Sequence, residues 1–369
     1  MDILLNVDHL TNYRETQIET FMKCANNHKM VLKILANTKK IKNLPLLKKY
    51  IHNGNFLKSE PIKIFNYCIW QPGLIFNIVD KKPKLAIIWG EVTRLNSWIV
   101  LILKRLKLIN TEITFWTHGI YGRENFILKN LRLFHLNLSD SILVYSEYSK
   151  NLLVKNGINR KKIFVIGNAI HRESEYSLKK IRENKSKNLN LLFVGRKLKR
   201  KKIFLIEEII RAWDEKFFLT FTCIGPDTKF LKEINFKNSK LIYVPAIYDP
   251  KVLQNYIDSS DYGICPDYIG LFCITCINSG LPVISHNNYP LHGPEGYTLI
   301  PEMNLINIKF PINSRNLKKS IIKAYSQKEF FSQRPLEISN TLSNEFKTKY
   351  VNKSIKNFMD TRLAVYKKL

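Results

Sequence analysis

Short apolar runs alternate with helix-like stretches along almost all of the 369 residues, and this alternation constrains the fold more than any other feature. Apolar runs bounded by turn residues are typical of strands buried inside a parallel sheet, and the stretches between them are typical of crossover helices. The predicted strands are 2–7, 30–35, 84–89, 112–117, 141–145 and 162–166 in a first series, and 189–194, 218–224, 240–244, 262–265 and 282–284 in a second. The sequence therefore predicts an α/β protein with two Rossmann-like, parallel-sheet domains.

A charged segment that lacks apolar periodicity, 171–190, separates the two series of predicted strands. A chain of this length is expected to form two domains rather than one. We predict an N-terminal domain over 1–170, a linker over 171–190, a C-terminal domain over 191–345 and a last helix over 346–369. We expect this last helix to pack back on the first domain.

The chain is strongly basic: 59 lysine and arginine residues against 30 acidic ones give a net charge of +29. This excess favours anionic partners such as nucleic acid, phosphorylated ligands or an anionic membrane surface. An AT-rich coding sequence would also explain many of the lysines, and the charge is spread along the whole chain. No helix-turn-helix, zinc-finger or aromatic RNA-binding signature is visible, so nucleic acid is not an expected partner.

The apolar run 98–103 ends at Lys104, whereas a membrane-spanning helix needs about 20 apolar residues. The first residues also lack the basic start and long apolar core of a secretion signal. We therefore expect a cytoplasmic protein. Residues 98–108 mix apolar and basic side chains on a predicted helix. This pattern fits a core helix, and it also fits a helix lying on the inner face of the membrane.

Six cysteines in a chain without a secretion signal do not predict a disulfide framework. Cys273 and Cys276 form a C-x-x-C pair with Cys265 upstream, but a zinc site needs further ligands that the spacing does not supply. We therefore interpret the three as small buried side chains. No Asp-x-Asp element occurs anywhere in the chain, and neither a metal nor another cofactor is expected.

Parallel α/β domains bind ligands at the loops that follow their strands. Gly195, Arg196 and Lys201 lie on such a loop, before a helix that begins near residue 203. Cations at the N-terminus of a helix favour a phosphate group, although a solvated basic loop explains the same residues equally well. Gly225 follows the next strand in a tight turn.

The spacing of these motifs resembles that of the GT-B glycosyltransferases, in particular the family-4-like (group 1) enzymes of bacterial surface polysaccharide synthesis. In the second half the resemblance rests on Gly195-Arg196 with Lys201, on Gly270-Leu271, and on Gly-Leu-Pro-Val at 280–283. In the first half it rests on a His-Gly loop, His118-Gly119, and on weaker segments at 140–146 and 165–169. The likeness covers residues 80–300 and implies a GT-B fold.

The sequence departs from the family pattern at its two glutamate positions, which Asp267 and Thr275 occupy. The family's first carboxylate contacts the donor sugar and its second binds the ribose. A shorter Asp267 can still accept hydrogen bonds, whereas Thr275 offers a single uncharged hydroxyl. Glu295, in a later segment that begins at Ser285, is a candidate for supplying a carboxylate from another direction.

The resemblance implies transfer of a sugar from a nucleotide-sugar to a hydroxyl of a glycan or lipid-linked glycan, as in capsule, lipopolysaccharide O-antigen or exopolysaccharide synthesis. A metal-independent reaction fits the absence of an Asp-x-Asp element, and the resemblance implies that the anomeric configuration is retained. Positively charged groups stabilise the departing diphosphate best. The predicted catalytic residues are His118, Arg196, Lys201 and Asp267, and the predicted donor-binding residues are Gly195, Gly225, Gly270, Leu271, Thr275 and Glu295.

Gly119, Glu91 and Arg14 are candidates for the acceptor side, because each lies beyond a predicted strand of the first domain. A lone His118 is more often structural, and a surface cap would explain Arg14 equally well. Three other functions stay open. One is a nucleotide-sugar epimerase of the same fold, the second is a degenerate sugar-nucleotide-binding protein suggested by Thr275, and the third, suggested by charge alone, is a nucleic-acid binder.

Overall fold

The computed structural model describes residues 1–37, 47, 54–64, 68–169, 177–179, 188–225 and 227–367. These residues form two compact units, one of Met1–Ile170 with Asn344–Leu369 and one of His171–Ser343. Most of the predicted linker, 171–190, lies outside the described residues. Each unit is an α/β sandwich around a largely parallel sheet, so the predicted fold class is confirmed.

In the described part of the first unit, seven strands form one parallel sheet in the order β3-β2-β1-β6-β7-β8-β9. Their bounds are β1 Ile3–His9, β2 Leu32–Asn37, β3 Phe56–Lys58, β6 Leu85–Trp89, β7 Glu112–Trp116, β8 Ser141–Val144 and β9 Ile163–Val165. A separate antiparallel pair consists of β4 (Ile62–Ile64) and β5 (Cys68–Trp70).

Helices cover both faces of this sheet, which explains why its central strands are mostly apolar and why β6 is apolar at every position. Alternate residues of β6 face opposite layers: Leu85 and Ile87 belong to one apolar cluster, and Ala86 and Ile88 to the other. The first layer contains α1 (Glu15–Asn27) and α13 (Thr348–Leu363), and the second α3 (Leu74–Val79), α4 (Leu95–Arg105), α5 (Phe126–Asn137) and α6 (Glu147–Lys155).

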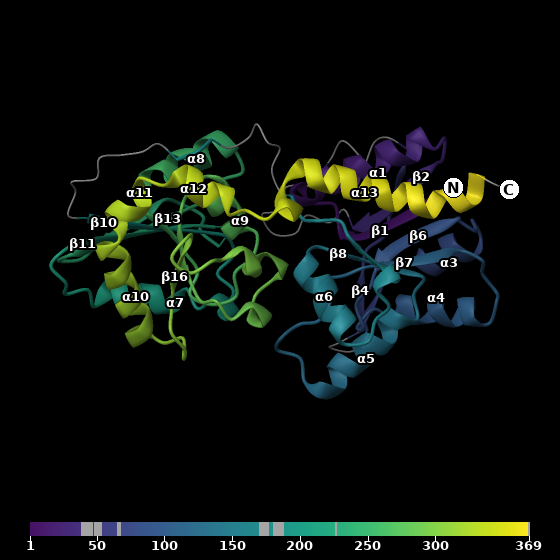
Figure 1. Cartoon of the computed structure of the whole chain (residues 1–369), viewed down its shortest axis with the longest axis horizontal. Helices are drawn as coiled ribbons and strands as arrows, with labels where there is room; N and C mark the ends of the chain where they lie inside the picture. Colours follow the sequence, from purple (N-terminus) through teal and green to yellow (C-terminus); the bar gives the residue numbers. More distant parts are fainter. Residues whose placement is uncertain are drawn as a thin grey trace. The chain divides into compact units, whose positions relative to one another are not determined.

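The last helix of the described chain, α13, belongs to the first unit and runs beside α1, as the yellow and purple helices of Figure 1 show. The Thr20 hydroxyl donates a 2.7 Å hydrogen bond to Asn352 Oδ1, and His28 Nε2 lies 2.7 Å from Asp360 Oδ1. Apolar side chains of α13, including Phe358, complete the core layer over β1. The C-terminal segment is therefore part of the N-terminal domain's core.

In the described part of the second unit, seven strands form a sheet in the order β12-β13-β11-β10-β14-β15-β16, parallel except for β12. The strands are β10 Asn188–Val194, β11 Phe218–Ile224, β12 Lys232–Asn235, β13 Ser239–Val244, β14 Tyr262–Ile264, β15 Val283–Ser285 and β16 Leu305–Asn307. The helices are α7 Phe204–Arg211, α8 Pro250–Ser259, α9 Phe272–Asn278, α10 Ser314–Ser326, α11 Lys328–Ser332 and α12 Pro335–Asn340.

The eleven predicted strands are all present, with ends that differ by two residues at most. The structure adds β3, β4, β5, β12 and β16, which the apolar pattern did not reveal. These strands have only three or four residues, and β3, β12 and β16 lie at sheet edges, where a short, partly exposed strand needs little apolar sequence. Among the described residues, no helix combines the length and the apolar composition that crossing a bilayer requires.

Candidate active site

Two glycines meet where the central strands of the second unit end. Gly195 follows β10 with φ +138° and donates a 2.9 Å hydrogen bond to the Ile224 carbonyl. A Cβ on Gly195 would lie 3.1 Å from Lys201 Nζ, and a Cβ on Gly225 would collide with the Gly195 carbonyl oxygen. Only glycine therefore lets the ends of β10 and β11 approach each other and the Lys201 ammonium lie against the backbone.

The Lys201 ammonium lies in a loop rich in cations, residues 196–202, which we call the cationic loop. Lys201 Nζ lies 4.9 Å from the centroid of the Phe193 ring. Burial lowers the pKa of Lys201, and the charges of Arg196 and Arg200 lower it further. Arg196 itself is exposed. The loop therefore holds several positive charges in a small volume, which favours an anionic ligand.

Lys197, in the same loop, has acidic partners. Its ammonium lies 2.6 Å from Glu207 Oε1 and 3.9 Å from the centroid of the Tyr243 ring, and its backbone N–H donates to Asp227 Oδ2 at 2.9 Å. For Lys201, no ion pair is found among the residues that the structure describes. The loop thus combines one cation that anchors it with others that remain available to a ligand.

Asp267 lies directly beyond β14, and three groups orient its nearly buried carboxylate. Oδ1 accepts a 2.8 Å hydrogen bond from the Tyr268 N–H and lies 3.3 Å from His286 Nε2. Oδ2 lies 3.5 Å from the ammonium of Lys202, a residue with φ +52° at the end of the cationic loop. Asp267 is therefore tied to this loop through Lys202.

Two stacked histidines support Asp267. The centroids of the His286 and His292 rings lie 4.0 Å apart, and the angle between the ring planes is 14°. His286 Nδ1 accepts the Asn288 N–H at 3.2 Å, and His292 Nδ1 accepts the Ile269 N–H at 3.1 Å. A backbone N–H can only donate, so each ring accepts through Nδ1 and carries its proton on Nε2. The Nε2–H of His286 points at Asp267, and the Nε2–H of His292 points at the His286 carbonyl oxygen.

The other predicted donor residues lie around α9. Thr275 is buried on this helix, Gly270 and Leu271 precede it, and Glu295 is buried nearby. A Cβ on Gly293 would lie 2.5 Å from Glu295 Oε2, so the Gly293 backbone lies directly against this carboxylate. The second unit thus presents a carboxylate from the segment that starts at Ser285, as a candidate substitute for the one absent at Thr275.

The cysteines of the second unit are core side chains, as the sequence analysis predicts. Cys265, Cys273 and Cys276 are buried and free. Burial raises the pKa of the Cys265 thiol to about 11, with Lys201 lowering it and Asp267 raising it, so both charged groups are close to one sulfur. Within the described residues, no cluster of His, Cys, Asp and Glu is arranged to hold a metal ion.

In the first unit, His118 and Gly119 follow β7. The His118 ring is partly exposed and lies 4.8 Å from the Tyr145 ring and 5.8 Å from the Trp89 ring, centroid to centroid. Gly119 has φ +86°, and its N–H donates to Thr117 Oγ1 at 3.1 Å. This tight turn places the imidazole among aromatic rings at the carboxyl end of the sheet.

Glu91 is held in an ion-pair network that the sequence analysis did not identify. Arg132 Nη1 lies 2.5 Å from Glu91 Oε2, and Arg132 Nε donates to Glu124 Oε1 at 2.8 Å. The Tyr121 hydroxyl donates to Glu91 Oε1 at 3.0 Å. Burial opposes the charge of Arg132, but Glu91 and Glu124 outweigh it and raise its pKa. This network joins the β6 and β7 loops to α5.

Arg14 lies directly beyond β1 and is buried rather than at the surface. Its guanidinium carbon lies 4.5 Å from the centroid of the Trp89 ring and 5.1 Å from that of Trp116. These two tryptophans end β6 and β7. The structure therefore brings both Arg14 and His118 against Trp89, at the carboxyl end of the first unit's sheet.

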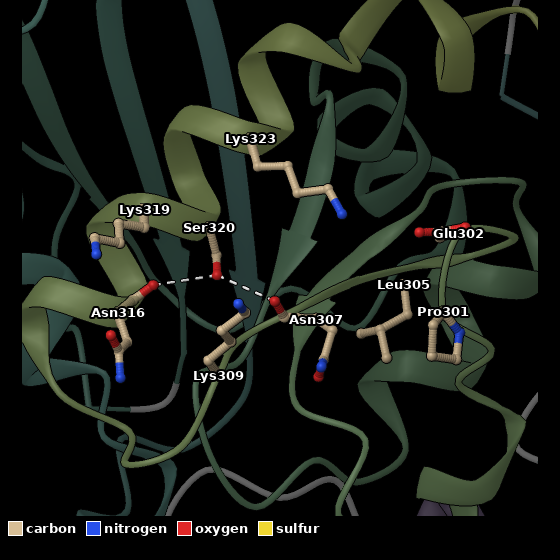
Figure 2. A pocket seen from close by; sticks show the side chains of 9 residues that line it. All are labelled: Pro301, Glu302, Leu305, Asn307, Lys309, Asn316, Lys319, Ser320 and Lys323. Atoms are coloured by element: carbon tan, nitrogen blue, oxygen red, sulfur yellow. Dashed lines mark hydrogen bonds between the residues drawn. The ribbon is translucent and has the colours of Figure 1, made fainter.

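A cavity of about 420 Å³ lies elsewhere in the second unit, between β16 and α10. Figure 2 shows Lys309, Lys319 and Lys323 around it, with the Ser320 hydroxyl bonded to the Asn307 carbonyl. None of the predicted donor-binding residues lines this cavity. It is therefore separate from the cationic loop.

No protein-family model matches the chain. An uncharacterised 41.2 kDa protein from the cps region of Klebsiella pneumoniae is 28% identical over 157 residues, which cover 40% of this chain and 43% of that protein. The match thus spans less than half the length of this relative.

Solved structures match the fold along nearly the whole chain. Sucrose-phosphate synthase from Thermosynechococcus elongatus has a TM-score of 0.66 at 12% identity, covering 99% of this chain and 100% of that one. The lipopolysaccharide outer core galactosyltransferase WaaB has a TM-score of 0.63 at 12% identity, with 100% of both chains covered. Anabaena HepE in complex with UDP and glucose has a TM-score of 0.63 at 12% identity, covering 98% and 100%.

These neighbours are GT-B glycosyltransferases, and the chain has their fold. A proposed UDP-N-acetylglucosamine 2-epimerase from Listeria monocytogenes also matches, with a TM-score of 0.57 at 12% identity over 100% of this chain and 97% of that one. The fold is therefore compatible both with glycosyl transfer and with sugar epimerisation.

Proposed function

We propose that this protein is a glycosyltransferase that moves a sugar from a nucleotide-sugar to a hydroxyl of a surface glycan. The observation that carries the proposal is the Gly195–Gly225 contact with the Lys201 ammonium packed against it, because such a cationic cradle at strand ends suits a diphosphate. Structural neighbours with UDP bound support a uridine diphosphate donor. The cps-region relative supports a capsule-type product.

In the proposed reaction, the bond between the anomeric carbon and the diphosphate oxygen breaks while the acceptor oxygen bonds to that carbon, and the acceptor's proton passes to the departing diphosphate. Negative charge grows on the departing diphosphate. Arg196 and Lys201 stabilise that charge, with no reorganisation needed because the glycine pair already fixes the loop. Asp267, oriented by His286 and Lys202, accepts hydrogen bonds from the sugar hydroxyls.

We further propose that the reaction needs no metal ion and retains the anomeric configuration. Positive side chains of the 196–202 loop supply the charge that a divalent cation supplies in other transferases. Turnover in the presence of a chelator tests the first point, and the anomeric configuration of the product, read by NMR, tests the second. Loss of activity on chelation, restored by Mg²⁺ or Mn²⁺, would contradict metal independence.

The first experiment presents the wild-type protein with UDP-, GDP-, CMP- and dTDP-sugars and follows thermal stability and nucleotide release. Stabilisation by one nucleotide-sugar is expected. Arg196→Ala should abolish nucleotide release while leaving the far-UV spectrum unchanged. Arg315→Ala, which removes an exposed arginine from α10, serves as the matched control. Full activity of the Arg196→Ala variant would contradict the proposal that this loop binds the diphosphate.

The epimerase is the second candidate function, because one structural neighbour is a proposed UDP-sugar epimerase. The same nucleotide-sugar panel separates the two candidates. An epimerase interconverts two UDP-sugars without an acceptor, whereas a transferase consumes the donor and releases UDP. A protein that binds a nucleotide-sugar but does neither would be the degenerate binder that Thr275 suggests.

We also propose that the protein works on the inner face of the cell membrane, where lipid-linked acceptors lie. Apolar side chains are exposed on two helices of the first unit that pack together through Trp98 and Phe134. The most exposed of them are Ile102, Leu106, Leu108, Phe126, Ile127, Leu131 and Phe134, of which Leu106 and Leu108 follow the end of the first helix. Arg105, Lys107 and Lys129 stand among them in the sequence. Exposed apolar groups with nearby cations are typical of surfaces that bind anionic lipid.

Vesicle sedimentation tests this location. The protein should sediment with vesicles that contain anionic phosphatidylglycerol and much less with neutral phosphatidylcholine, because the cations require negative headgroups. The double variant Phe126→Ser with Ile127→Ser, on α5, should reduce sedimentation without changing nucleotide release in solution. Equal binding to both kinds of vesicle, or none, would argue against the membrane surface.

A further inference from the structure

Arg14 is a buried cation that forms no ion pair with a carboxylate among the described residues, although Tyr145 and Tyr13, with a smaller contribution from Asp8, outweigh its burial and raise its pKa. Only 8% of its surface is exposed, and its guanidinium packs on the rings of Trp89 and Trp116. Aromatic faces attract a cation, but they contribute about 2 kcal/mol when desolvated. Removing the charge from water costs several kcal/mol. Aromatic packing therefore offsets only part of this cost, and a hydrogen bond with the Tyr13 side chain offsets more of it.

The carboxylates of the first unit's site are engaged elsewhere. Asp8 pairs with Arg94, and Glu91 and Glu124 both pair with Arg132. Among the described residues, no carboxylate forms an ion pair with Arg14. The parts of this unit that fall outside the described residues, 38–46, 48–53, 65–67, 170 and 368–369, contain no Asp or Glu. Asp8 is the one carboxylate whose charge acts on Arg14 among the described residues, and it is shared with Arg94.

Further donors near Arg14 lack acceptors. Arg14 Nη1, Arg94 Nη1 and Trp116 Nε1 are buried and make no hydrogen bond within the described part of the chain. All three residues are at least nine-tenths buried. Leaving a buried donor unpaired costs about 1–3 kcal/mol, so three such donors at the end of one sheet call for an acceptor.

His9, at the end of β1, reports the local charge. Burial lowers the pKa of its imidazole, Asp8 raises it, and Arg14 and Arg94 both lower it. The ring therefore lies within reach of both arginines. Positive charge at this edge of the sheet is thus only partly offset by the single carboxylate of Asp8.

We propose that the acceptor carries an anionic group, a carboxylate or a phosphate, that Arg14 binds with Arg94 and Trp116 as further donors. The inference rests on the proposed function, which makes the first unit the acceptor side. A planar guanidinium offers paired N–H groups to either anion, and a charge-assisted hydrogen bond is about twice as strong as a neutral one. An acidic sugar residue would supply the carboxylate, and a lipid-linked or phosphorylated sugar the phosphate.

The test uses the full-length protein and three probes: methyl β-glucuronoside, its neutral counterpart methyl β-glucoside, and glucose 1-phosphate. Equilibrium binding should be measurable for at least one anionic probe and absent for the neutral glucoside. A response to the glucuronoside alone identifies an acidic sugar, and a response to the phosphate alone identifies a phosphorylated acceptor. Equal binding of all three probes, or of none, would overturn the proposal without any variant being made.

Variants then assign the anion to Arg14. Arg14→Gln should weaken binding of the anionic probe by about 30-fold or more, because it removes one partner of a buried charge pair. Arg14→Lys should keep part of the affinity. Arg160→Gln, an exposed arginine of the same unit, is the matched control and should bind normally. Unchanged binding by a folded Arg14→Gln would also overturn the proposal.

The outcome is independent of the donor site. UDP-sugar binding depends on the second unit, so every variant above should keep it. If the wild type binds no nucleotide-sugar but still prefers the anionic probe, the proposed function fails and the anion site stands. If the wild type binds the nucleotide-sugar but shows no preference for an anionic probe, the proposed function stands and the anion site fails.

Discussion

Arg132 and Arg14 belong to the same unit and are buried to nearly the same extent, yet their surroundings differ completely. Arg132 lies between Glu91 and Glu124, and its hydrogen bonds reach both carboxylates. Arg14 packs against two indole rings and hydrogen-bonds the Tyr13 side chain, and it forms no ion pair with a carboxylate among the described residues. A chain that needed both cations only for stability would be expected to pair both. The difference indicates that Arg132 holds the structure together and that Arg14 is kept for a ligand.

The second unit repeats the same contrast within a single loop. Lys197 is paired with Glu207, and burial, which disfavours its charge, is outweighed by this carboxylate, so its pKa is raised. For Lys201, burial and the neighbouring arginines lower the pKa instead. In both units, the paired cations Arg132 and Lys197 hold the loops at the carboxyl ends of the strands in place. The cations without a carboxylate partner, Arg14 and Lys201, are the candidates for binding substrate.

The largest expected effect concerns stability. Arg132→Met leaves Glu91 and Glu124 nearly buried without a counter-charge, so the free energy of unfolding should fall by about 3–5 kcal/mol. Arg14→Met leaves no charged partner behind and should change it by at most about 1 kcal/mol. Urea denaturation of both variants decides the matter. Similar losses in the two would make Arg14 a structural cation and break the comparison.

A smaller effect is expected on catalysis in the second unit. Lys201→Met removes the ammonium that lies against Gly195, and kcat/KM for the donor should fall by about 100-fold or more. Lys197→Met, in the same loop, should change kcat/KM far less, because Glu207 already neutralises Lys197. Steady-state kinetics of the two variants gives the answer, and equal losses would show that the loop acts only through its net charge.

Much of this arrangement could be predicted from the sequence, and the reasons are local. Strands buried on both faces are largely apolar, so β6, which has no polar residue, and β11, whose only polar residues are two threonines, are visible as apolar runs. Gly195 and Gly225 are recognisable because a strand followed by glycine marks a site of close approach. The short edge strands, such as β12 with the sequence Lys-Glu-Ile-Asn at 232–235, carry no comparable signal.

Side-chain partners are the part that the sequence could not supply. Arg14 is 75 residues from Trp89, and Glu91 is 41 residues from Arg132, so neither contact follows from spacing along the chain. A surface cap was therefore an equally good interpretation of Arg14. His286, which supports Asp267, could have been identified as a polar residue directly after a strand. The signal was present there, but only the fold shows what the side chain contacts.

The pH dependence of stability tests the surroundings of Arg132, through the neighbouring His135. His135 is buried beside Phe115, and burial, aided by the charge of Arg132, lowers its pKa to about 3. The unfolded chain takes up a proton near pH 6.5, whereas the folded protein does not, so stability falls as the pH drops below 6.5. The loss should reach about 2 kcal/mol at pH 5. Denaturation midpoints across this range should fall less steeply for His135→Phe than for the wild type.

The smallest expected effect is a change in the pKa of His9, the histidine close to Arg14. Burial lowers the pKa of His9, and the positive charges of Arg14 and Arg94 lower it further. An anion bound to Arg14 would offset one of these charges, so the anionic probe should raise the pKa of His9 in an NMR titration. The neutral glucoside should leave it unchanged. His135, whose pKa depends on burial and on Arg132, is the internal control and should not respond to either probe. A shift of His135 together with His9 would mean that the probe changes the whole unit rather than the charge at Arg14.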